Sequence, residues 1–484
     1  MAAAIPTPDR PGIVGRMAAN AVAQIVGIPL QSLLSLATFA AITRYLGPSV
    51  FGDYVAAMAY LFLPTVIADL GISTIVLRDI STEPERMDAI VRAATAFRVA
   101  VSTVAIGASV GVAYALPFNN RAQVAILIGA GGSFLTLLNL SLLPVLQAQL
   151  RMHWAVVASI AGRLTTLVVT LAALAAGLGF KTIVLATVIG NAVVLLFDLR
   201  VVWALFPVRP TVDPVYWRRL LRTSLVLGSG IAILNIYFRI DAVLLALLRP
   251  AAEVGLYGAA YKFVELAGAL SGGIVVSLVP SLTSLAARGD SRFNSLAQRG
   301  FDVLIFIAIP ISVSMVLAAK TLLHLTAGAK FESASDALKI LALYPLLSFA
   351  NAVFLRMLIA AHLERMLLPI ALGILALNVG LNLVFIPMYG YRAAAVASVA
   401  SEVASLLAMG WMVRVKLGFN LHVAYLTRLL GAGGCMALVA WLLPIPELGA
   451  LVVGGLVYVV ILLVLPGTVR WTASELALTT GLRR

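Results

Sequence analysis

The feature that most limits the fold of this chain is a succession of long apolar segments separated by short polar breaks. A helix needs roughly 20 mainly apolar residues to cross the hydrocarbon core of a bilayer. Apolar residues make up 62% of the 484 residues and charged residues only 11%, whereas a soluble domain has about 25% charged residues. We therefore expect an all-α polytopic membrane protein. About fourteen spans are predicted, at residues 17–43, 54–77, 93–116, 122–147, 155–178, 182–206, 222–248, 254–279, 301–323, 338–361, 367–387, 393–413, 423–443 and 448–466, with twelve or thirteen as alternatives where a Pro/Gly break splits a pair.

The two halves of the chain repeat one another. FGDYVAA, which contains Gly52, returns 203 residues later as VGLYGAA, which contains Gly255. GFKTIVLATVIGNAVVLL, from Gly179, returns 211 residues later as GYRAAAVASVASEVASLL, from Gly390. Two matches in the same order indicate one structural unit written twice. Duplicated halves in so apolar a chain favour a transporter with its pathway between the halves.

The repeat predicts four parts. They are a six-helix lobe at 1–206, a cytoplasmic linker at 207–221, a second six-helix lobe at 222–416, and an extra helical pair with a tail at 417–484. Lys and Arg are concentrated on the side that a cytoplasmic N-terminus would place inside, so both termini are predicted to be cytoplasmic. The net charge of +14 is spread over many short loops beside lipid headgroups, and nucleic acid is not the implied partner.

Several classes of protein are disfavoured by what the sequence lacks. No segment outside the predicted spans is long enough for a soluble catalytic domain, and no GxxxxGK[ST] loop indicates direct use of ATP. The single cysteine, Cys435, and the dispersed histidines show no metal-ligand spacing. We therefore predict neither an enzyme nor a metal site.

Charges inside membrane spans are costly, so each marks a candidate functional position. Arg239 lies ten residues before Arg249, about 15 Å from the predicted outer end, which is too deep for easy snorkelling. Asn235 shares a helical face with Arg239, whereas Asp241 shares a face with Tyr237. Arg239 and Asp241 are thus not expected to form a simple local ion pair, and at least one should face a cavity or another helix.

The next span carries a polar face. Tyr257, Tyr261 and Glu265 follow one another at helical spacing of four, and Lys262 precedes Glu265 by three. Aromatic and charged groups on one face suit a wet wall that contacts sugar. A structural Lys262–Glu265 ion pair inside the bundle is the equal alternative.

The remaining intramembrane candidates lie mainly in the first half. Arg163 lies about nine residues into its span, Asp69 is expected to be buried, and Arg98 is expected to snorkel to the cytoplasmic headgroups. In the second half, Glu402 replaces Asn191 at the matching position of the repeat. A carboxylate, unlike an amide, can titrate or bind a cation.

Three stretches resemble one family of membrane proteins. They are TRYLGPSVFGDYVAAMAYLFLPTVIADLGISTIVLRDIS (Thr43–Ser81), YFRIDAVLLALLRPAAEVGLYGAAYKFVE (Tyr237–Glu265) and ILALNVGLNLVFIPMYGYRAAAVASVASE (Ile374–Glu402). Together they make the chain, from about residue 15 to 415, similar to oligosaccharide flippases of the multidrug/oligosaccharidyl-lipid/polysaccharide (MOP) superfamily. The resemblance implies two six-helix lobes in a V-shape, with two extra helices.

The resemblance also implies a function. Such flippases move polyprenyl-diphosphate-linked oligosaccharide from the inner to the outer leaflet of the bacterial plasma membrane, and polysaccharide polymerases and glycosyltransferases are the implied partners. The implied cationic cavity would use Arg239, Lys262, Arg163 and Arg98. We hypothesise that an acidic residue couples transport to a cation, either a proton or sodium; no other cofactor is expected. The candidates for coupling or for the polar cavity wall are Asp69, Asp241, Glu265, Glu402, Tyr257, Tyr261 and Asn235.

One alternative remains within the same superfamily. A drug/cation antiporter would present acidic cavity residues, and here the intramembrane Arg and Lys at least match the acids in number, which favours an anionic substrate. A major-facilitator transporter would carry a basic, Gly-containing loop after its second span, where this chain reads LRDISTEPERMD. A membrane glycosyltransferase or polymerase would need a large outer loop or a carboxylate-rich site, and neither is present.

Overall fold

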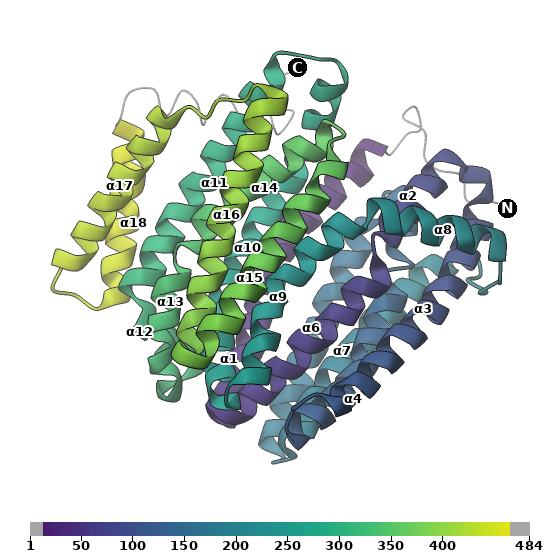
Figure 1. Cartoon of the computed structure of the whole chain (residues 1–484), viewed down its shortest axis with the longest axis horizontal. Helices are drawn as coiled ribbons and strands as arrows, with labels where there is room; N and C mark the ends of the chain where they lie inside the picture. The colour runs from purple at the N-terminus through teal and green to yellow at the C-terminus, as the bar shows by residue number, and fades with distance from the viewer. Residues whose placement is uncertain (1–12, 465–484) are drawn as a thin grey trace. The chain divides into compact units, whose positions relative to one another are not determined.

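A computed structural model describes residues 13–464, and all the regular structure in that range is helical (Figure 1). The N-terminal segment 1–12 and the residues of the predicted tail from 465 onward lie outside the described residues. The helices are α1 Ile13–Asp69, α2 Ile72–Thr82, η1 Pro84–Arg86, α3 Met87–Ala115, α4 Asn120–Asn139, α5 Leu143–Ala148, α6 Met152–Ala175, α7 Gly179–Trp203, α8 Pro214–Leu227, α9 Ser229–Leu248, α10 Ala251–Ala287, α11 Arg292–Leu317, α12 Ala319–Ala327, η2 Ala329–Ala334, α13 Ser335–Leu341, α14 Tyr344–Ala360, η3 Glu364–Met366, α15 Leu367–Tyr389, α16 Tyr391–Leu417, α17 Val423–Leu442 and α18 Glu447–Val464.

The all-α polytopic class is confirmed. Among the described residues, ten helices are long and apolar enough to cross a membrane, or eleven if the bent pair Ala329–Leu341 and Tyr344–Ala360 is one span. The first two predicted spans share α1, which bends where Gly47 adopts φ 70° and Pro48 follows. Proline restricts the residue before it and supplies no N–H, so the helix changes direction there. The count of fourteen and the division into two six-helix lobes stay predictions.

The helices form two compact units. The first contains α1 to α9, the start of α10 through Ala259, residues 326–331, and the stretch 362–401 with η3, α15 and the start of α16. Within it, α1 packs against α3, α4, α6 and α9, while α6 packs against α7 and α9 against α15. The second unit contains the rest of α10, α11, α12, α13, α14, the end of α16, and the pair α17 and α18. There, α11 packs against α14 and α17.

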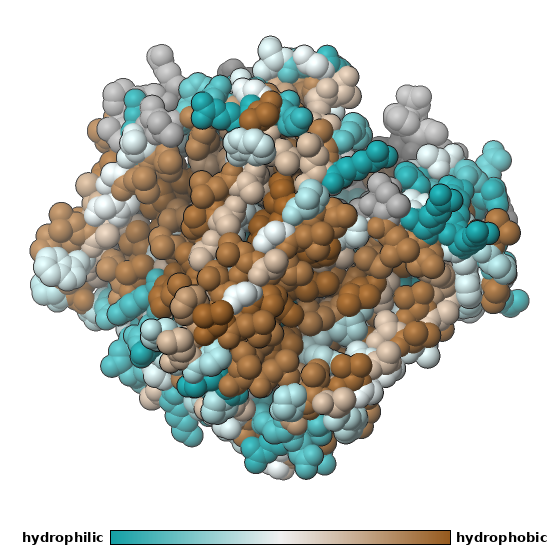
Figure 2. Space-filling model, viewed as in Figure 1, coloured by the Kyte–Doolittle hydropathy of each residue, from teal (hydrophilic) through white to brown (hydrophobic). Residues whose placement is uncertain are grey.

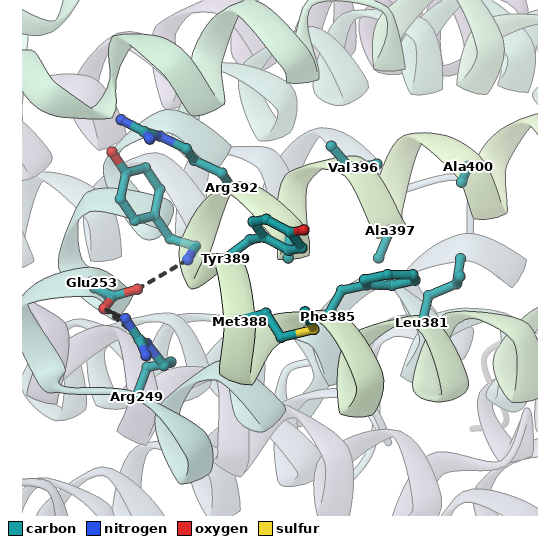
Figure 3. A pocket seen from close by; sticks show the side chains of 12 residues that line it. Arg249, Glu253, Leu381, Phe385, Met388, Tyr389, Arg392, Val396, Ala397 and Ala400 are labelled. Carbon is teal, nitrogen blue, oxygen red and sulfur yellow. Dashed lines mark hydrogen bonds and ion pairs between the residues drawn. The ribbon is translucent and has the colours of Figure 1, made fainter.

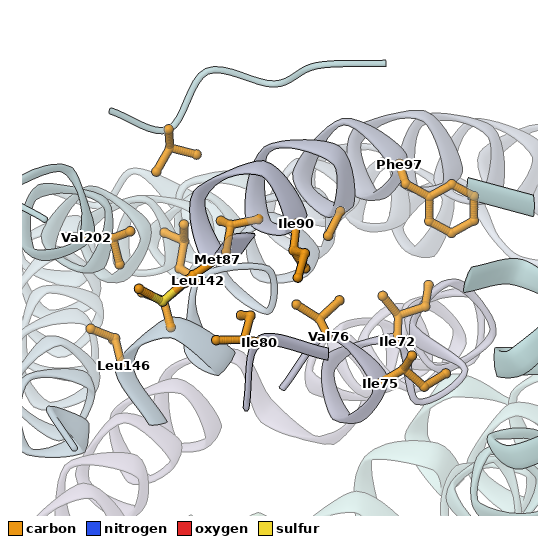
Figure 4. Packing of buried hydrophobic residues seen from close by; sticks show 14 of the residues in the cluster. Ile72, Ile75, Val76, Ile80, Met87, Ile90, Phe97, Leu142, Leu146 and Val202 are labelled. Atoms are coloured by element: carbon orange, nitrogen blue, oxygen red, sulfur yellow. The ribbon is translucent and has the colours of Figure 1, made fainter. Parts of the chain in front are cut away.

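The first unit has an apolar core at the ends of its helices (Figure 4). Ile80, Val91 and Leu146 are fully buried in it, and they come from α2, α3 and α5. Trp217 of α8 packs against the same core and donates its indole N–H to the carbonyl of Ala93 over 3.0 Å. The predicted linker is therefore attached to the first unit through α8.

The surface follows the pattern of a membrane protein. On the face drawn in Figure 2, apolar residues cover the middle stretches of the helices, and hydrophilic residues gather towards the helix ends. Large apolar side chains are exposed on α17 and α18, including Trp441 at 74% and Val464 at 75%. Such exposure suits helices whose outer faces meet lipid rather than water.

Two glycines of the sequence repeat meet where α1 crosses the start of α10. A Cβ added at Gly52 would collide with the carbonyl oxygen of Ala251, and one added at Gly255 would collide with that of Pro48. Pro48 and Ala251 are themselves 203 residues apart, so the contact is reciprocal. Only glycine allows two helix backbones to approach this closely, which explains why this residue recurs in both halves.

Candidate substrate and ion-coupling sites

Arg98, Asp69 and Ser73 form a compact polar cluster between α3, α1 and α2. The Arg98 guanidinium donates to Asp69 over 2.7 Å and to Ser73 over 2.9 Å, and the Ser73 hydroxyl donates to Asp69 over 2.9 Å. Arg98 is only 1% exposed, whereas Asp69, expected to be buried, is half-buried because it lies at the end of α1. The prediction that Arg98 snorkels to the headgroups is wrong. Its guanidinium forms an ion pair with the Asp69 carboxylate inside the bundle, so it does not need to reach the lipid headgroups to find an anionic partner.

Asp241 lies in a second buried cluster, formed by α9, the start of α10 and α16. Its side chain accepts hydrogen bonds from the hydroxyls of Tyr257 and Ser398, the latter over 2.8 Å, and from the N–H of Ala242 over 2.7 Å. Tyr237 donates to the carbonyl of Ser398 over 3.2 Å. The shared face of Tyr237 and Asp241, predicted from their spacing, is confirmed, because both meet Ser398.

Ser398 was not predicted from the sequence, nor was the asparagine pair nearby on α15. Asn378 donates to the hydroxyl of Ser401 over 3.2 Å, and Asn382 donates to the side-chain oxygen of Asn378 over 2.9 Å. Asn378 and Asn382 are 1% and 0% exposed. The available signal was their spacing of four on an otherwise apolar span, which places both amides on one helical face.

Arg239 and Asn235 are half-buried on α9. The Arg239 guanidinium lies 5.8 Å from the ring centroid of Phe62, in cation–π geometry. The Asp241 carboxylate points to Tyr257 and Ser398, in keeping with the expected separation of Arg239 and Asp241 around the helix. Phe62 belongs to α1, so Arg239 reaches another helix of the same unit.

In the second unit, Lys262 and Glu265 form an ion pair along α10. Their Nζ and Oε2 atoms are 3.1 Å apart, and the side chains are 18% and 29% exposed. The predicted i,i+3 pair is therefore present. Tyr261, 7% exposed, packs edge-on against Tyr344 with ring centroids 6.3 Å apart. The two tyrosines of the predicted ladder thus have different partners: Tyr257 meets Asp241, and Tyr261 meets another aromatic ring.

The repeat position that differs between the halves contacts a neighbouring helix in each case. Asn191 of α7 donates to the carbonyl of Gly132 on α4 over 3.2 Å. Glu402 of α16, 3% exposed, accepts from the Asn351 amide on α14 over 2.8 Å. The carboxylate has therefore kept the interhelical role of the amide while adding a titratable group.

Arg163 is exposed on α6. Its part in a cationic cavity stays a prediction, as do the transport roles of all the candidates above. Within the range 13–464, no three His, Cys, Asp or Glu side chains come together in an arrangement that could hold a metal ion.

Asp79, near the end of α2, anchors the linker helix α8. Its carboxylate is 3.3 Å from Arg219 and 3.4 Å from Arg78, and the Tyr216 hydroxyl donates to it over 3.3 Å. Burial, together with the adjacent carboxylate, raises the pKa of Tyr216 and keeps its hydroxyl a hydrogen-bond donor. This attachment was not predicted from the sequence, which indicated only a linker at 207–221.

These features define a multi-pass membrane protein with charged and polar side chains buried between its helices. The chain matches the family described as "Polysaccharide biosynthesis protein" over residues 17–286, more than half of its length, and it belongs to that family. A search of curated proteins returned no match.

The fold is similar to that of solved MOP-superfamily structures. A structure of the lipid II flippase MurJ in an inward closed conformation is 15% identical, with a TM-score of 0.76 over 91% of this chain and 98% of that one. An inward-facing multidrug resistance MATE family transporter is 13% identical, with a TM-score of 0.65 over 82% and 98%. A MOP superfamily transporter from Pyrococcus furiosus, described as having a binding pocket of reverse polarity, is 15% identical, with a TM-score of 0.59 over 83% of this chain and 95% of that one. The resemblance to the MOP superfamily inferred from the sequence is confirmed.

Proposed function

We propose that this protein is a flippase for polyprenyl-diphosphate-linked oligosaccharide, moving it from the inner to the outer leaflet of a bacterial plasma membrane for cell-surface polysaccharide synthesis. The observation that carries the proposal is its membership of the polysaccharide biosynthesis family, on a fold shared with a lipid flippase. Both termini would be cytoplasmic, and polysaccharide polymerase and glycosyltransferases would be the functional partners.

Fixed cations inside the membrane support an anionic substrate. Moving a diphosphate from water into hydrocarbon without compensation is prohibitive, and arginine offers donors in a geometry that matches phosphate. Arg239 is held half-buried on α9 beside Phe62. Lys262 is 18% exposed and pairs with Glu265. Arg239 is the stronger candidate for the diphosphate because a guanidinium offers paired donors, whereas a lysine presents a point charge. Arg98 is already committed to Asp69, and its role is structural in this proposal.

Asp241 is the coupling carboxylate in this proposal. Of the four acidic candidates, Asp69 is paired with Arg98, Glu265 with Lys262, and Glu402 accepts from an amide. Asp241 is 3% exposed and is met by hydroxyls and a backbone N–H. Hydroxyl oxygens can also turn their lone pairs towards a bound cation. A proton or a sodium ion could therefore be bound and released there during the transport cycle.

Helix packing supports alternating access between two related parts. Helix α1 packs against α6, and the helix that follows the linker, α9, packs against α15. Likewise, α3 packs against α4 and α11 against α14. The same packing order in both halves suits two repeats that rock around a central site.

The test is translocation of a fluorescent polyprenyl-diphosphate oligosaccharide in proteoliposomes. We expect Arg239→Ala to abolish transport, while Arg200→Ala, an exposed arginine in the last turn of α7, leaves it unchanged. Loss of transport in both variants, or in neither, would contradict a diphosphate site at Arg239.

The second candidate is a cation-coupled drug antiporter, favoured by the likeness to a multidrug resistance MATE transporter. The same proteoliposomes separate the two functions. Efflux of an organic cation dye, with no translocation of any lipid-linked sugar, would replace the flippase proposal with the antiporter.

A further inference from the structure

A pocket of about 720 Å³ lies where α15 ends and α16 begins, beside the turn between α9 and α10 (Figure 3). Its size is within the roughly 300–1,000 Å³ typical of small-molecule sites. The predicted topology places Arg249 and Arg392, which line it, at the outer ends of their spans. None of the residues considered for transport lines this pocket.

The pocket is amphipathic. Figure 3 shows Arg249, Glu253 and Arg392 together towards one end, and Leu381 and Ala400 at the other. The rest of the lining is largely apolar and aromatic. A ligand with an anionic head and an apolar tail would match both ends.

The apolar end opens towards lipid. Both α15 and α16 are apolar enough to cross a membrane. Phe385 is 42% exposed, Met388 66% and Val396 53%. Exposed apolar side chains on a membrane span face hydrocarbon, and Tyr389 and Tyr391 mark the level of the membrane–water interface. An acyl chain could therefore enter from the side.

The polar end is held by an ion pair. Arg249 and Glu253 are 2.6 Å apart, and the second oxygen of Glu253 accepts the N–H of Tyr391 over 3.1 Å. Gly390 has φ 61°, and a Cβ there would collide with the Glu253 carboxylate. Glycine at this turn thus lets the Glu253 carboxylate approach the backbone. The carboxylate in turn holds the Arg249 guanidinium in place through the ion pair.

Two arginines and one glutamate line this end of the pocket. The Arg392 guanidinium lies 5.8 Å from the ring centroid of Tyr391. A guanidinium carries its N–H donors in the plane of the group, in a geometry that suits phosphate oxygens. We propose that this pocket binds an anionic phospholipid, with its phosphodiester beside Arg392 and Arg249 and one acyl chain along Leu381, Phe385 and Val396.

The experiment is native mass spectrometry of the purified, delipidated full chain. It is titrated with phosphatidylglycerol, with phosphatidylcholine of the same chains, and with inorganic phosphate. We expect phosphatidylglycerol to bind about fivefold more tightly to wild type than to Arg392→Gln, as one basic residue near an anionic headgroup implies. Lys181→Gln, which removes an exposed cation at the start of α7, should bind it like wild type.

A second variant addresses the acyl chain and does not depend on the folding of the first. Val396→Trp should fill the apolar end and weaken phosphatidylglycerol binding, and a photoactivatable acyl chain should label residues 381–400 in wild type but not in this variant. Equal affinity for the two phospholipids, binding of inorganic phosphate with the same affinity as phosphatidylglycerol, or labelling elsewhere on the chain would each overturn the proposal.

Discussion

Two carboxylates in the first unit show how differently one chain can stabilise an acidic group between membrane helices. Asp69 is paired with a fully buried arginine, so its charge is balanced within the protein. Asp241 is more deeply buried, and the partners described for it are two hydroxyls and a backbone N–H. The first arrangement holds helices together in one charge state. The coupling role that we propose for Asp241 requires a carboxylate of the second kind, at which a cation can be exchanged without breaking one of the described ion pairs.

The largest expected effect comes from breaking the ion pair. Arg98→Ala leaves the Asp69 carboxylate without its cation, and removing one partner of a buried pair costs about 3–5 kcal/mol. We expect the lower part of that range, because Asp69 is 28% exposed on its side chain. Unfolding by denaturant in mixed micelles measures the change. The double variant Arg98→Met/Asp69→Leu should recover most of the loss, and a single variant as stable as wild type would show that the pair is not structural.

A smaller loss is expected from Ser398→Ala. The change removes one hydroxyl donor from the Asp241 carboxylate, and a hydrogen bond to a charged group contributes about 1.5–3 kcal/mol. The same denaturant titration measures it. Ser405→Ala provides the matched control, as another buried serine on α16. Equal losses in the two variants would mean that the hydrogen bond to Asp241 contributes no more to the free energy of unfolding than any other buried serine does.

Asp241→Asn should hardly change stability but should change function. The amide keeps the size of the carboxylate: its oxygen can accept from the Ala242 N–H while its NH2 donates to the hydroxyl oxygens of Tyr257 and Ser398. The free energy of unfolding should therefore move by less than about 1 kcal/mol. Transport should lose its dependence on the sodium or proton gradient. Asp69→Asn, in contrast, should lower stability and leave the ion dependence of the remaining transport intact. The reverse pattern would exchange the roles of the two carboxylates.

The smallest effect is expected at an exposed pair outside the spans. The side chain of Arg292, hydrogen-bonded to Asp290, lowers the pKa of that carboxyl to about 2. A depressed folded pKa stabilises the protein above the unfolded value of about 4 and loses that contribution as the pH falls through the folded value. Thermal melts of wild type and Asp290→Asn should therefore keep a constant separation between pH 5 and 8. Any pH dependence of transport in that window must come from other groups.

The all-helical class and the superfamily resemblance were predictable because they depend on hydropathy and on local sequence. The relative directions of side chains two to four residues apart on one helix were also predictable, as Tyr237 with Asp241 and Lys262 with Glu265 show. Contacts between distant helices were not. The burial of Arg98 depends on the position of Asp69, 29 residues away, and the Asp241 site depends on Ser398, 157 residues away. Hydropathy alone does not determine which residues of two distant helices lie opposite one another.

The crossing of Gly52 and Gly255 places corresponding residues of a duplicated sequence against each other. In symmetry terms it is an isologous contact, of the kind found at the two-fold axis of a homodimer, contained within one polypeptide. Gly52 leaves space for the backbone of α10 at Ala251, and Gly255 leaves space for the backbone of α1 at Pro48. A substitution in either copy therefore acts on both helices at once, and the two positions constrain each other as a single site would.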